Sequence, residues 1–398
     1  MPIDTARKRF WLVTARVGAG HVQAAKAIEE ELIARGLGDQ VRTIDIMTIV
    51  PGWFRRMYAG GYAWLASRAP RLYGALFRSA DAPDSIEPTF SEGLRIRLEG
   101  YCIRQLKSEL IQDPPDWVIH THFLAPHPIA RWIAAQKLPT KQAAVVTDFY
   151  PHRIWINPAV DLYCVPKPAS HARLIAGGVR RDRIAITGIP VLAKHRLPTD
   201  KAATFREFGW PPDRKVILLL SGADFVIGPF KRTVLDILSV FPDVTLQAAT
   251  GNNENLRRAL EMLKPTHRNL RVIGYCDKMQ ELFAAADIVI SKTGGITTSE
   301  CLAHGAAMIA LFPVPGQEEY NADFLVRFGA GLKVVQEDAV VPAIRSLIEQ
   351  PEVLSQMRDT AKALGKPLAA KSVVDAILGG GSPGPGVTDL SERELSAR

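Results

Sequence analysis

Residues suited to binding a phosphate and a ribose follow one another closely in the second half of the chain. An apolar run typical of a buried strand, Ile288–Ile290, leads into Lys292-Thr293-Gly294-Gly295, and a helical pattern then begins with Thr297-Thr298-Ser299-Glu300. Two glycines let the backbone approach a phosphate, and the N–H groups of a helix N-terminus point at it. Glu300, one turn into the helix, can accept both hydroxyls of a ribose. The other interpretation is an ordinary strand–turn–helix unit with a capped helix.

A second strand-like run, Met308–Phe312, leads into Pro-Val-Pro-Gly-Gln-Glu-Glu, which begins at Pro313. Gln317 and Glu318 therefore lie just after a strand, where parallel α/β sheets place ligand contacts. Together with the preceding residues, they predict a site for a nucleotide and the group attached to it.

This stretch resembles the donor-site signature of the glycosyltransferase family that includes monogalactosyldiacylglycerol synthases, bacterial processive diacylglycerol glucosyltransferases and, more distantly, the peptidoglycan GlcNAc transferase. The resemblance implies an α/β fold with two doubly wound Rossmann-like domains facing a cleft, the GT-B fold. It also implies that a UDP-sugar is the donor substrate and that no cofactor is needed. The residues implied for the diphosphate and ribose are Thr293, Gly294, Gly295, Thr297, Thr298 and Glu300, and those implied for the sugar are Gln317 and Glu318.

Three more positions match donor contacts of the family. Gly222 lies after the strand-like run Val216–Leu220, in a loop where the family usually has more glycine than this chain, which has Ala223 and Asp224 before Gly228. Asn252 matches a residue near the base. Met279 matches the segment around the uracil, although a core methionine on a helix is the commoner role for such a residue.

Near the N-terminus, a strand-like run, Phe10–Ala15, precedes Val-Gly-Ala-Gly-His and a helical pattern to about Arg35. Gln23 stands where a dinucleotide fingerprint has its third glycine, so we expect no nicotinamide or flavin. The segment resembles the family's Gly-rich loop, which ends in glycine and histidine. A helix N-terminus lowers the proton affinity of an imidazole, and a neutral histidine can act as a general base. His21 is therefore a candidate catalytic base, with helix capping or phosphate binding as the alternative.

The segment from Pro51 to Ala80 has five arginines, seven aromatic residues and no acid. Aromatic rings favour the membrane headgroup boundary and arginines favour anionic lipid, so the segment predicts an interfacial element. Within it, the resemblance implies acceptor or membrane contacts for Trp53, Arg55, Arg56 and Trp64. A core helical hairpin with a solvated basic face, or a patch for single-stranded nucleic acid, would use the same residue types.

Two more strand-like runs end in polar residues, Thr121-His122 and Thr147-Asp148, which we expect at the ligand edge of the sheet. The run from Thr147 to Trp155 resembles the family's Thr-Asp…His…Trp element on the acceptor side. Asp148 is a candidate catalytic residue and His152 a candidate acceptor contact. A helix N-cap for Asp148 and a satisfied core position for His152 are the alternatives.

Composition describes a globular protein that prefers anionic partners. The 398 residues carry a net charge of +8 with a pI near 9.3, which favours nucleic acid, acidic lipid or phosphorylated substrates. Four widely spaced cysteines match no metal spacing, so we expect reduced, buried thiols of a cytosolic protein. We find no run of about 18 apolar residues that would span a membrane and no secretory signal, and therefore expect peripheral association with the inner membrane face.

Domain limits follow from the strand–helix alternation and a Pro-rich, charged linker near residues 192–214. We expect an acceptor and membrane-binding domain over residues 1–195, a donor domain over 196–378 and a disordered tail over 379–398. Leu94–Leu110 reads as one packing helix, and Ser372–Leu378 as a helix that finishes the fold.

The expected activity is an inverting, metal-independent transfer of a hexose from a UDP-sugar to diacylglycerol or a similar lipid. The chain contains no Asp-x-Asp, and a helix N-terminus can stabilise a leaving diphosphate in place of a metal. A UDP-sugar epimerase on the same fold is the first alternative, and a non-catalytic nucleotide-sugar sensor or nucleic-acid binder the second. Expected partners are a UDP-sugar, a lipid acceptor and an anionic membrane surface, without nucleic acid.

Overall fold

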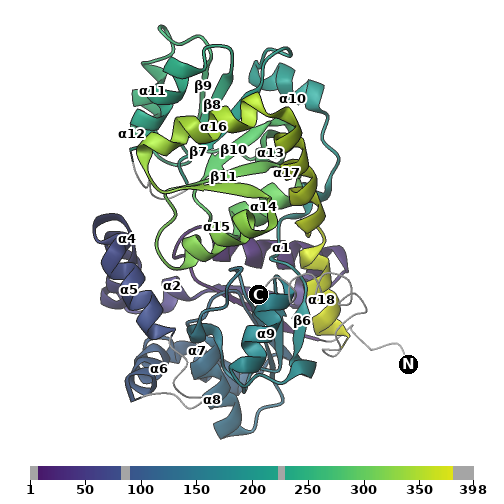
Figure 1. Cartoon of the computed structure of the whole chain (residues 1–398). Coiled ribbons are helices and arrows are strands. Elements are labelled where there is room, and N and C mark those ends of the chain that lie inside the picture. Colours follow the sequence, from purple (N-terminus) through teal and green to yellow (C-terminus); the bar gives the residue numbers. More distant parts are fainter. Residues whose placement is uncertain (1–7, 82–89, 223–228, 380–398) are drawn as a thin grey trace. The chain divides into compact units, whose positions relative to one another are not determined.

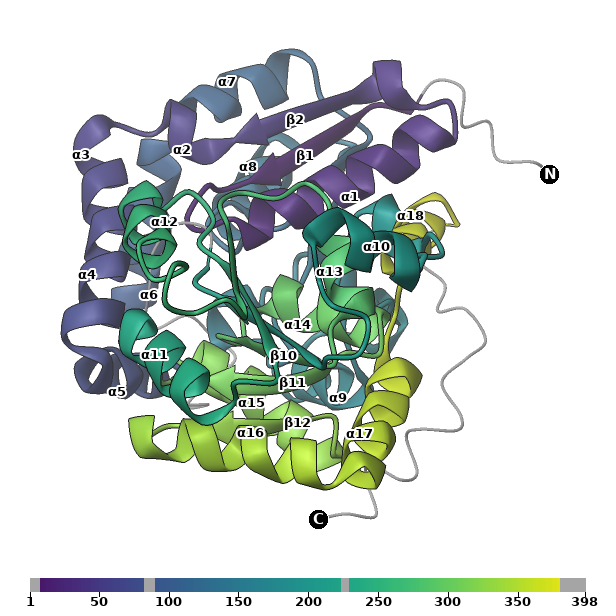
Figure 2. The same cartoon turned by 90° about the horizontal axis from the view of Figure 1, so that it is seen from above.

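The computed structural model describes residues 8–81, 90–222 and 229–379, which divide into two compact units (Figures 1 and 2). Unit 1 contains the described residues up to Ala193 and again from Leu368, and unit 2 runs from Lys194 to Pro367. Each unit is built on one six-stranded parallel sheet. The predicted fold class, two Rossmann-like α/β units, is therefore confirmed.

The sheet of unit 1 has the strand order β2-β1-β3-β4-β5-β6. The strands are β1 (Phe10–Thr14), β2 (Val41–Asp45), β3 (Trp117–His120), β4 (Lys141–Val145), β5 (Leu162–Val165) and β6 (Ile184–Ile186). The α-helices are α1 (Gly20–Ala34), α2 (Ile46–Ile49), α3 (Gly52–Arg55), α4 (Gly61–Arg68), α5 (Pro70–Ala80), α6 (Phe90–Cys102), α7 (Arg104–Gln112), α8 (Pro126–Gln136), α9 (Pro168–Ala176) and α18 (Ala369–Leu378). A π-helical turn, Arg56–Gly60, joins α3 to α4, and short 3₁₀ turns lie at Gly38–Gln40, Arg153–Trp155, Arg181–Arg183 and Ala193–Arg196.

Alternation along β1 shows how this sheet is covered on both faces. Phe10 and Leu12 join one buried cluster with residues of α1 and α18. Trp11 and Val13 join another with residues of α3, α7 and α8. Strands that are buried on both faces have continuous apolar sequences, and this is why Phe-Trp-Leu-Val could be predicted as a strand.

The sheet of unit 2 has the order β12-β11-β10-β7-β8-β9. The strands are β7 (Val216–Leu220), β8 (Thr245–Ala249), β9 (Leu270–Ile273), β10 (Ile288–Ser291), β11 (Ala307–Leu311) and β12 (Gly331–Val334). The helices are α10 (Lys201–Phe208), α11 (Phe230–Val240), α12 (Glu254–Glu261), α13 (Met279–Ala285), α14 (Gly295–Ala303), α15 (Gln317–Phe328), α16 (Val340–Glu349) and α17 (Pro351–Leu364), with a 3₁₀ turn at Glu337–Ala339. Ile217 and Leu219 pack with residues of α11 and α16.

Several expectations about elements need correction. The predicted helix over Leu94–Leu110 is two helices, α6 and α7, which break at Ile103. The predicted linker contains α10, whose N-cap Asp200 accepts the N–H groups of Ala202 and Ala203. None of the helices in the described ranges combines the length and apolar character that a membrane crossing requires. The four cysteines form no disulfide, and Cys276 is half-buried rather than buried.

The division into units also differs from the expected domains, because α18 belongs to unit 1 and not to the donor half. Val373 and Ile377 of α18 are fully buried among residues of α1 and the unit 1 sheet. Arg35, just after α1, lies 2.8 Å from Asp375 of α18. The apolar face of α18 thus completes the core of the first unit. Residues 380–398 of the predicted tail lie outside the described residues.

The assignment of α18 makes a stability prediction. Ile377→Ala removes buried methyl groups, which costs about 2–5 kcal/mol, and we expect faster amide exchange in β1 but not in β7. Leu354→Ala is the matched control, because Leu354 of α17 is buried in unit 2. It should accelerate exchange in β7 and leave β1 unchanged. Faster exchange in β7 after Ile377→Ala would show that α18 stabilises unit 2 and contradict its assignment to unit 1.

Candidate active site

The strand orders mark where a ligand edge is expected in each unit. In a doubly wound sheet, ligands bind beyond the carboxyl ends of the two strands between which the chain direction switches. In unit 1 these strands are β1 and β3, followed by His21 and by Thr121-His122. In unit 2 they are β7 and β10, followed by Gly222 and by Thr293-Gly294-Gly295. Of the predicted residues, His21 in unit 1 and Gly222, Thr293, Gly294 and Gly295 in unit 2 therefore lie at the switch points.

The turn after β10 is fixed by hydrogen bonds to helix α15. Thr293 is fully buried, and its hydroxyl donates to the carbonyl oxygen of Glu318 at 2.6 Å. Its own carbonyl accepts from the side-chain amide of Asn321 at 2.9 Å. Both partners lie on α15, so Thr293 fixes the turn to the next helix.

Helix α14 begins after this turn without a side-chain cap. Its N-cap is Gly294, no acidic residue lies in its first turn, and its first bond is the Thr298 N–H to the Gly294 carbonyl, at 3.0 Å. By contrast, Asp200 caps α10 and Asn253 caps α12. Helices α1, α8 and α11 also start without a side-chain cap. What distinguishes α14 is its position after two glycines at the switch point of the unit 2 sheet. Free N–H groups and the helix dipole make such an end suitable for a phosphate.

The remaining predicted residues of α14 differ in exposure. Gly295 and Thr298 are buried, whereas Thr297 and Glu300 are partly exposed. The buried hydroxyl of Thr298 finds no hydrogen-bond partner among the described residues. Thr297 and Glu300, three residues apart, lie on one side of the helix and are available to a ligand.

Glu300 has neighbours that the sequence did not reveal. Its Oε1 lies 3.1 Å from Nε2 of His195, whose side chain is fully buried. Nδ1 of His195 lies 3.1 Å from Nε2 of His304, and burial lowers the pKa of His304 to about 4. His304 is therefore neutral, and its ring contacts His195, which in turn lies beside the Glu300 carboxylate. Nothing in the sequence indicated that His195 belongs to the site, because its partners Glu300 and His304 are about a hundred residues away in the chain.

The loop between β11 and α15 is conformationally unusual. Phe312 has φ +46°, which is unusual for a residue other than glycine, and Gly316 has φ +99°, which only glycine adopts readily. Glu318 is buried, its Oε2 accepts the Val314 N–H at 3.1 Å, and burial raises the pKa of its carboxyl. Glu318 therefore holds this loop in place, while Gln317 is half-buried at the start of α15.

The other three predicted donor contacts are spread over loops and one helix end. Gly222 follows β7 with φ +91°, and Gly228 lies outside the described residues. Asn252 is exposed after β8, just before the N-cap of α12. Met279 is half-buried at the first position of α13.

In unit 1, three segments meet around His21. Its Nδ1 lies 2.8 Å from the carbonyl oxygen of Thr121 and 3.0 Å from the hydroxyl of Thr147. The Thr121 hydroxyl donates to the His21 carbonyl at 2.9 Å. A carbonyl can only accept, so Nδ1 carries the proton and Nε2 keeps its lone pair. Burial lowers the pKa of His21 to about 4, against the opposing effect of the Thr121 bond.

Aromatic contacts join this histidine to the segment from Pro51 to Ala80. The His21 ring centroid is 4.5 Å from that of His122, which is 6.1 Å from that of Tyr58. The Tyr58 ring also stacks on buried Phe54. The segment is thus anchored beside the candidate base by a few inward rings.

The outer side of the same segment exposes large apolar side chains. The exposed fractions are 47% for Trp53, 52% for Met57 and 60% for Trp64, and Leu72 and Leu76 of α5 are also about half exposed. Arg55 and Arg56 are exposed among them. Exposed aromatic and basic side chains suit an interface. The alternative, a core hairpin with a solvated basic face, accounts for the exposed arginines but not for the exposed tryptophans.

Asp148 and His152 are buried. His152 accepts the N–H of Ile154 through Nδ1 and donates through Nε2 to the carbonyl of Phe77 on α5, at 3.0 Å. These contacts are those of a satisfied buried histidine, and they tie the turn after β4 to α5. Asp148 lies directly after Thr147, beside the His21 cluster.

Comparison with known proteins gives the same two halves. Residues 21–191 match the family model for monogalactosyldiacylglycerol synthase, and residues 229–373 match the glycosyltransferase family 28 C-terminal domain. A processive diacylglycerol beta-glucosyltransferase of Bacillus thuringiensis is 28% identical over 372 residues, which cover 92% of each chain.

Solved structures share the fold at lower identity. A putative UDP-N-acetylglucosamine 2-epimerase from Listeria monocytogenes has a TM-score of 0.63 at 15% identity, covering 94% of this chain and 96% of its own. MurG of Acinetobacter baumannii has a TM-score of 0.57 at 16% identity, covering 93% and 99%. With both halves matched by family models and nearly the whole length shared with a curated relative, the chain is a glycosyltransferase that is similar to the monogalactosyldiacylglycerol synthases and processive diacylglycerol glucosyltransferases.

Proposed function

We propose that the chain transfers a hexose from a UDP-sugar to the hydroxyl group of diacylglycerol or a similar lipid. The observation that carries this proposal is the uncapped start of α14 after Gly294, with Glu300 one turn further on the same helix. The relative from Bacillus thuringiensis, a processive diacylglycerol beta-glucosyltransferase by name, supports the choice of acceptor.

In this mechanism the diphosphate lies on the N–H groups that open α14, and the ribose hydroxyls donate to Glu300. The acceptor hydroxyl gives its proton to Nε2 of His21 as its oxygen attacks the anomeric carbon. In the same step, the bond from that carbon to the diphosphate oxygen breaks, and the configuration at the carbon inverts. The helix N-terminus stabilises the charge that develops on the leaving diphosphate, which is the role a metal plays in other transferases.

The exposed aromatic and basic side chains of α3 to α5 support the proposal that this reaction takes place at a membrane surface. Trp53 and Trp64 enter the headgroup boundary, and Arg55 and Arg56 meet anionic lipid there. The enzyme thus works as a peripheral protein on the inner face of the membrane.

The test is incubation of the protein with lipid vesicles containing diacylglycerol and each common UDP-sugar, followed by mass spectrometry of the lipid extract. A new glycolipid is the expected product. The second candidate, a UDP-sugar epimerase, predicts isomerised donor in a reaction without lipid. That outcome without any glycolipid would replace the proposal.

The position of His195 predicts a selective effect on donor binding. His195→Ala removes the group that backs Glu300, so we expect the KM for the UDP-sugar to rise about tenfold, equivalent to about 1.4 kcal/mol. The kcat should stay within about twofold of wild type, because Glu300 binds the ribose, whereas the reaction occurs at the anomeric carbon of the transferred hexose.

Two further variants separate positioning by His195 from general stability. His195→Gln keeps an amide near the carboxylate and should recover part of the affinity, whereas His267→Ala, a half-buried histidine of the same unit, should change nothing. A fall in kcat at unchanged KM would contradict the positioning role.

The lowered pKa of His21 predicts the acid side of the pH profile. An ordinary histidine loses half of its base form near pH 6.5, but His21 with a pKa of about 4 stays neutral well below that value. We therefore expect kcat/KM to stay flat from pH 8 down to about pH 5. A decline with a midpoint near 6.5 would show that His21 is not desolvated in the working enzyme.

A further inference from the structure

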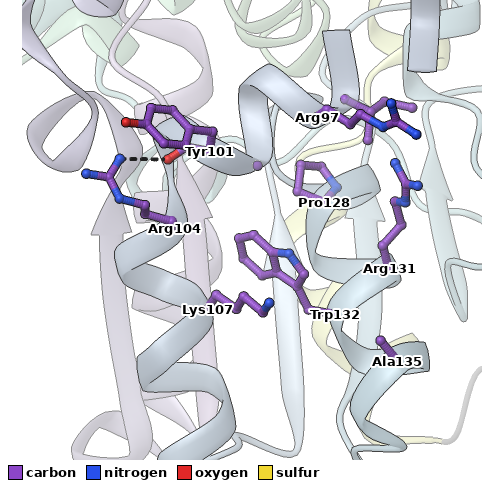
Figure 3. A pocket seen from close by; sticks show the side chains of 10 residues that line it. Arg97, Tyr101, Arg104, Lys107, Pro128, Arg131, Trp132 and Ala135 are labelled. Atoms are coloured by element: carbon purple, nitrogen blue, oxygen red, sulfur yellow. Dashed lines mark hydrogen bonds between the residues drawn. The ribbon is translucent and has the colours of Figure 1, made fainter. Parts of the chain in front are cut away.

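A cationic groove lies in unit 1 between α6, α7 and α8, away from every residue assigned above (Figure 3). Its volume is about 450 Å³, within the range of small-molecule sites, about 300–1,000 Å³. Four cations line it, Arg97 from α6, Arg104 and Lys107 from α7 and Arg131 from α8. No carboxylate is among its lining residues.

The four cations of this groove have no acidic partner among the residues that the structure describes. Within the described ranges, no ion pair involves any of the four cations, although the neighbouring Arg95 pairs with Glu99 and Arg42 with Glu109. Figure 3 shows the guanidinium groups of Arg97 and Arg131 pointing toward one another. Two like charges held close without an acid favour an anion between them.

The rest of the lining suits a phosphate attached to something apolar. Trp132 of α8 forms a wall, and the guanidinium of Arg104 lies 4.4 Å from the ring centroid of Tyr101 while donating to its carbonyl. Leu94, Leu98 and Tyr101 follow one another along one side of α6 with exposed fractions of 60%, 40% and 58%. An apolar stripe therefore borders the cationic groove, and both lie on the helix that follows the proposed membrane segment.

We propose that this groove binds the phosphate of an anionic phospholipid headgroup, with the stripe of α6 meeting the lipid's apolar part. A free phosphate would need the cations but not the exposed stripe. The inference rests on the proposed action at a membrane, and it adds a second contact with anionic lipid, separate from the aromatic and basic side chains of α3 to α5.

The test is binding of the full chain to vesicles of phosphatidylcholine with and without phosphatidylglycerol, measured without UDP-sugar or diacylglycerol. Each cation near an acidic surface contributes about a fivefold gain in binding, so Arg97→Gln combined with Arg131→Gln should weaken binding to phosphatidylglycerol vesicles by about 30-fold. Binding to pure phosphatidylcholine should not change.

The matched control is Lys26→Gln combined with Arg181→Gln, which removes the same charge from exposed positions elsewhere in unit 1. It should change binding by less than about twofold. Equal weakening by both pairs would show diffuse attraction to the net charge and overturn the groove as a site, as would unaltered binding of the groove variant.

Two competitors test the chosen ligand. Excess glycerol 3-phosphate should not displace the protein from vesicles, and displacement would assign the groove to a soluble phosphate ester. A single-stranded RNA that binds wild type but not the groove variant, with vesicle binding intact, would assign it to nucleic acid. Because the assay needs no catalysis, charge-selective vesicle binding without glycolipid formation would remove the proposed function and keep the groove.

Discussion

Replacement of His21 by alanine is expected to lower kcat at least a hundredfold while the affinity for UDP stays within about twofold of wild type. General base catalysis contributes about 10²–10⁴ in rate. The bond from Nδ1 to the Thr121 carbonyl leaves Nε2 as the base, and burial keeps the ring neutral at working pH. His122, the neighbouring histidine, already uses its unprotonated Nδ1 to accept the N–H of Leu124.

Two variants make this result interpretable. His21→Asn keeps a donor for the Thr121 carbonyl but has no base, so it should fold like wild type and be as inactive as the alanine variant. His171→Ala, on a different helix of the same unit, should retain full activity. If UDP affinity fell together with the rate, His21 would instead be binding phosphate, which was the alternative at the level of the sequence.

The parts of the fold that were predictable are those whose residues report burial directly. Val216–Leu220 is an unbroken aliphatic run buried in the middle of its sheet, and its limits were predicted correctly. The edge strands β2 and β12 were not predicted. Thr43 is exposed in β2 and Lys333 half-buried in β12, so neither strand has the pattern of a buried one.

Contacts between residues that are far apart in the sequence could not be predicted either. Helix α18 follows the donor half in sequence, and only its contacts with α1 assign it to unit 1. The same holds for His195 beside Glu300 and for the four cations of the groove between α6 and α8. A residue pattern predicts which face of an element is apolar, but not which distant element will cover it.

The candidate site was predictable where the close approach of a ligand favours particular residues. Gly294 and Gly295 after a buried strand predicted a phosphate-binding turn, and a histidine after a Gly-rich loop predicted a base. Side-chain direction was not predictable from spacing. Glu318, expected at the sugar, accepts the Val314 N–H as a buried carboxylate, and this assignment needed the loop conformation around Gly316.

Gly294→Val is expected to weaken UDP binding at least a hundredfold, about 2.7 kcal/mol, with nearly unchanged stability. The fold itself does not require glycine at this position. Gly294 has φ −62° and ψ 145°, which any residue adopts, and a Cβ atom there would meet no protein atom within 4 Å. The change at the N-cap should cost roughly 1 kcal/mol or less of unfolding free energy.

Gly365 supplies the contrasting case in the same unit. A Cβ atom there would lie 2.4 Å from the carbonyl oxygen of Leu302, so Gly365→Ala should lower the melting temperature through a steric clash in the fold. Calorimetric titration with UDP and thermal unfolding separate the two glycines. A Gly294→Val protein that melts like wild type but does not bind UDP would mean that the space above this turn is kept open for a ligand. Wild-type affinity in that variant would place the diphosphate elsewhere and remove the basis for assigning Glu300 to the ribose.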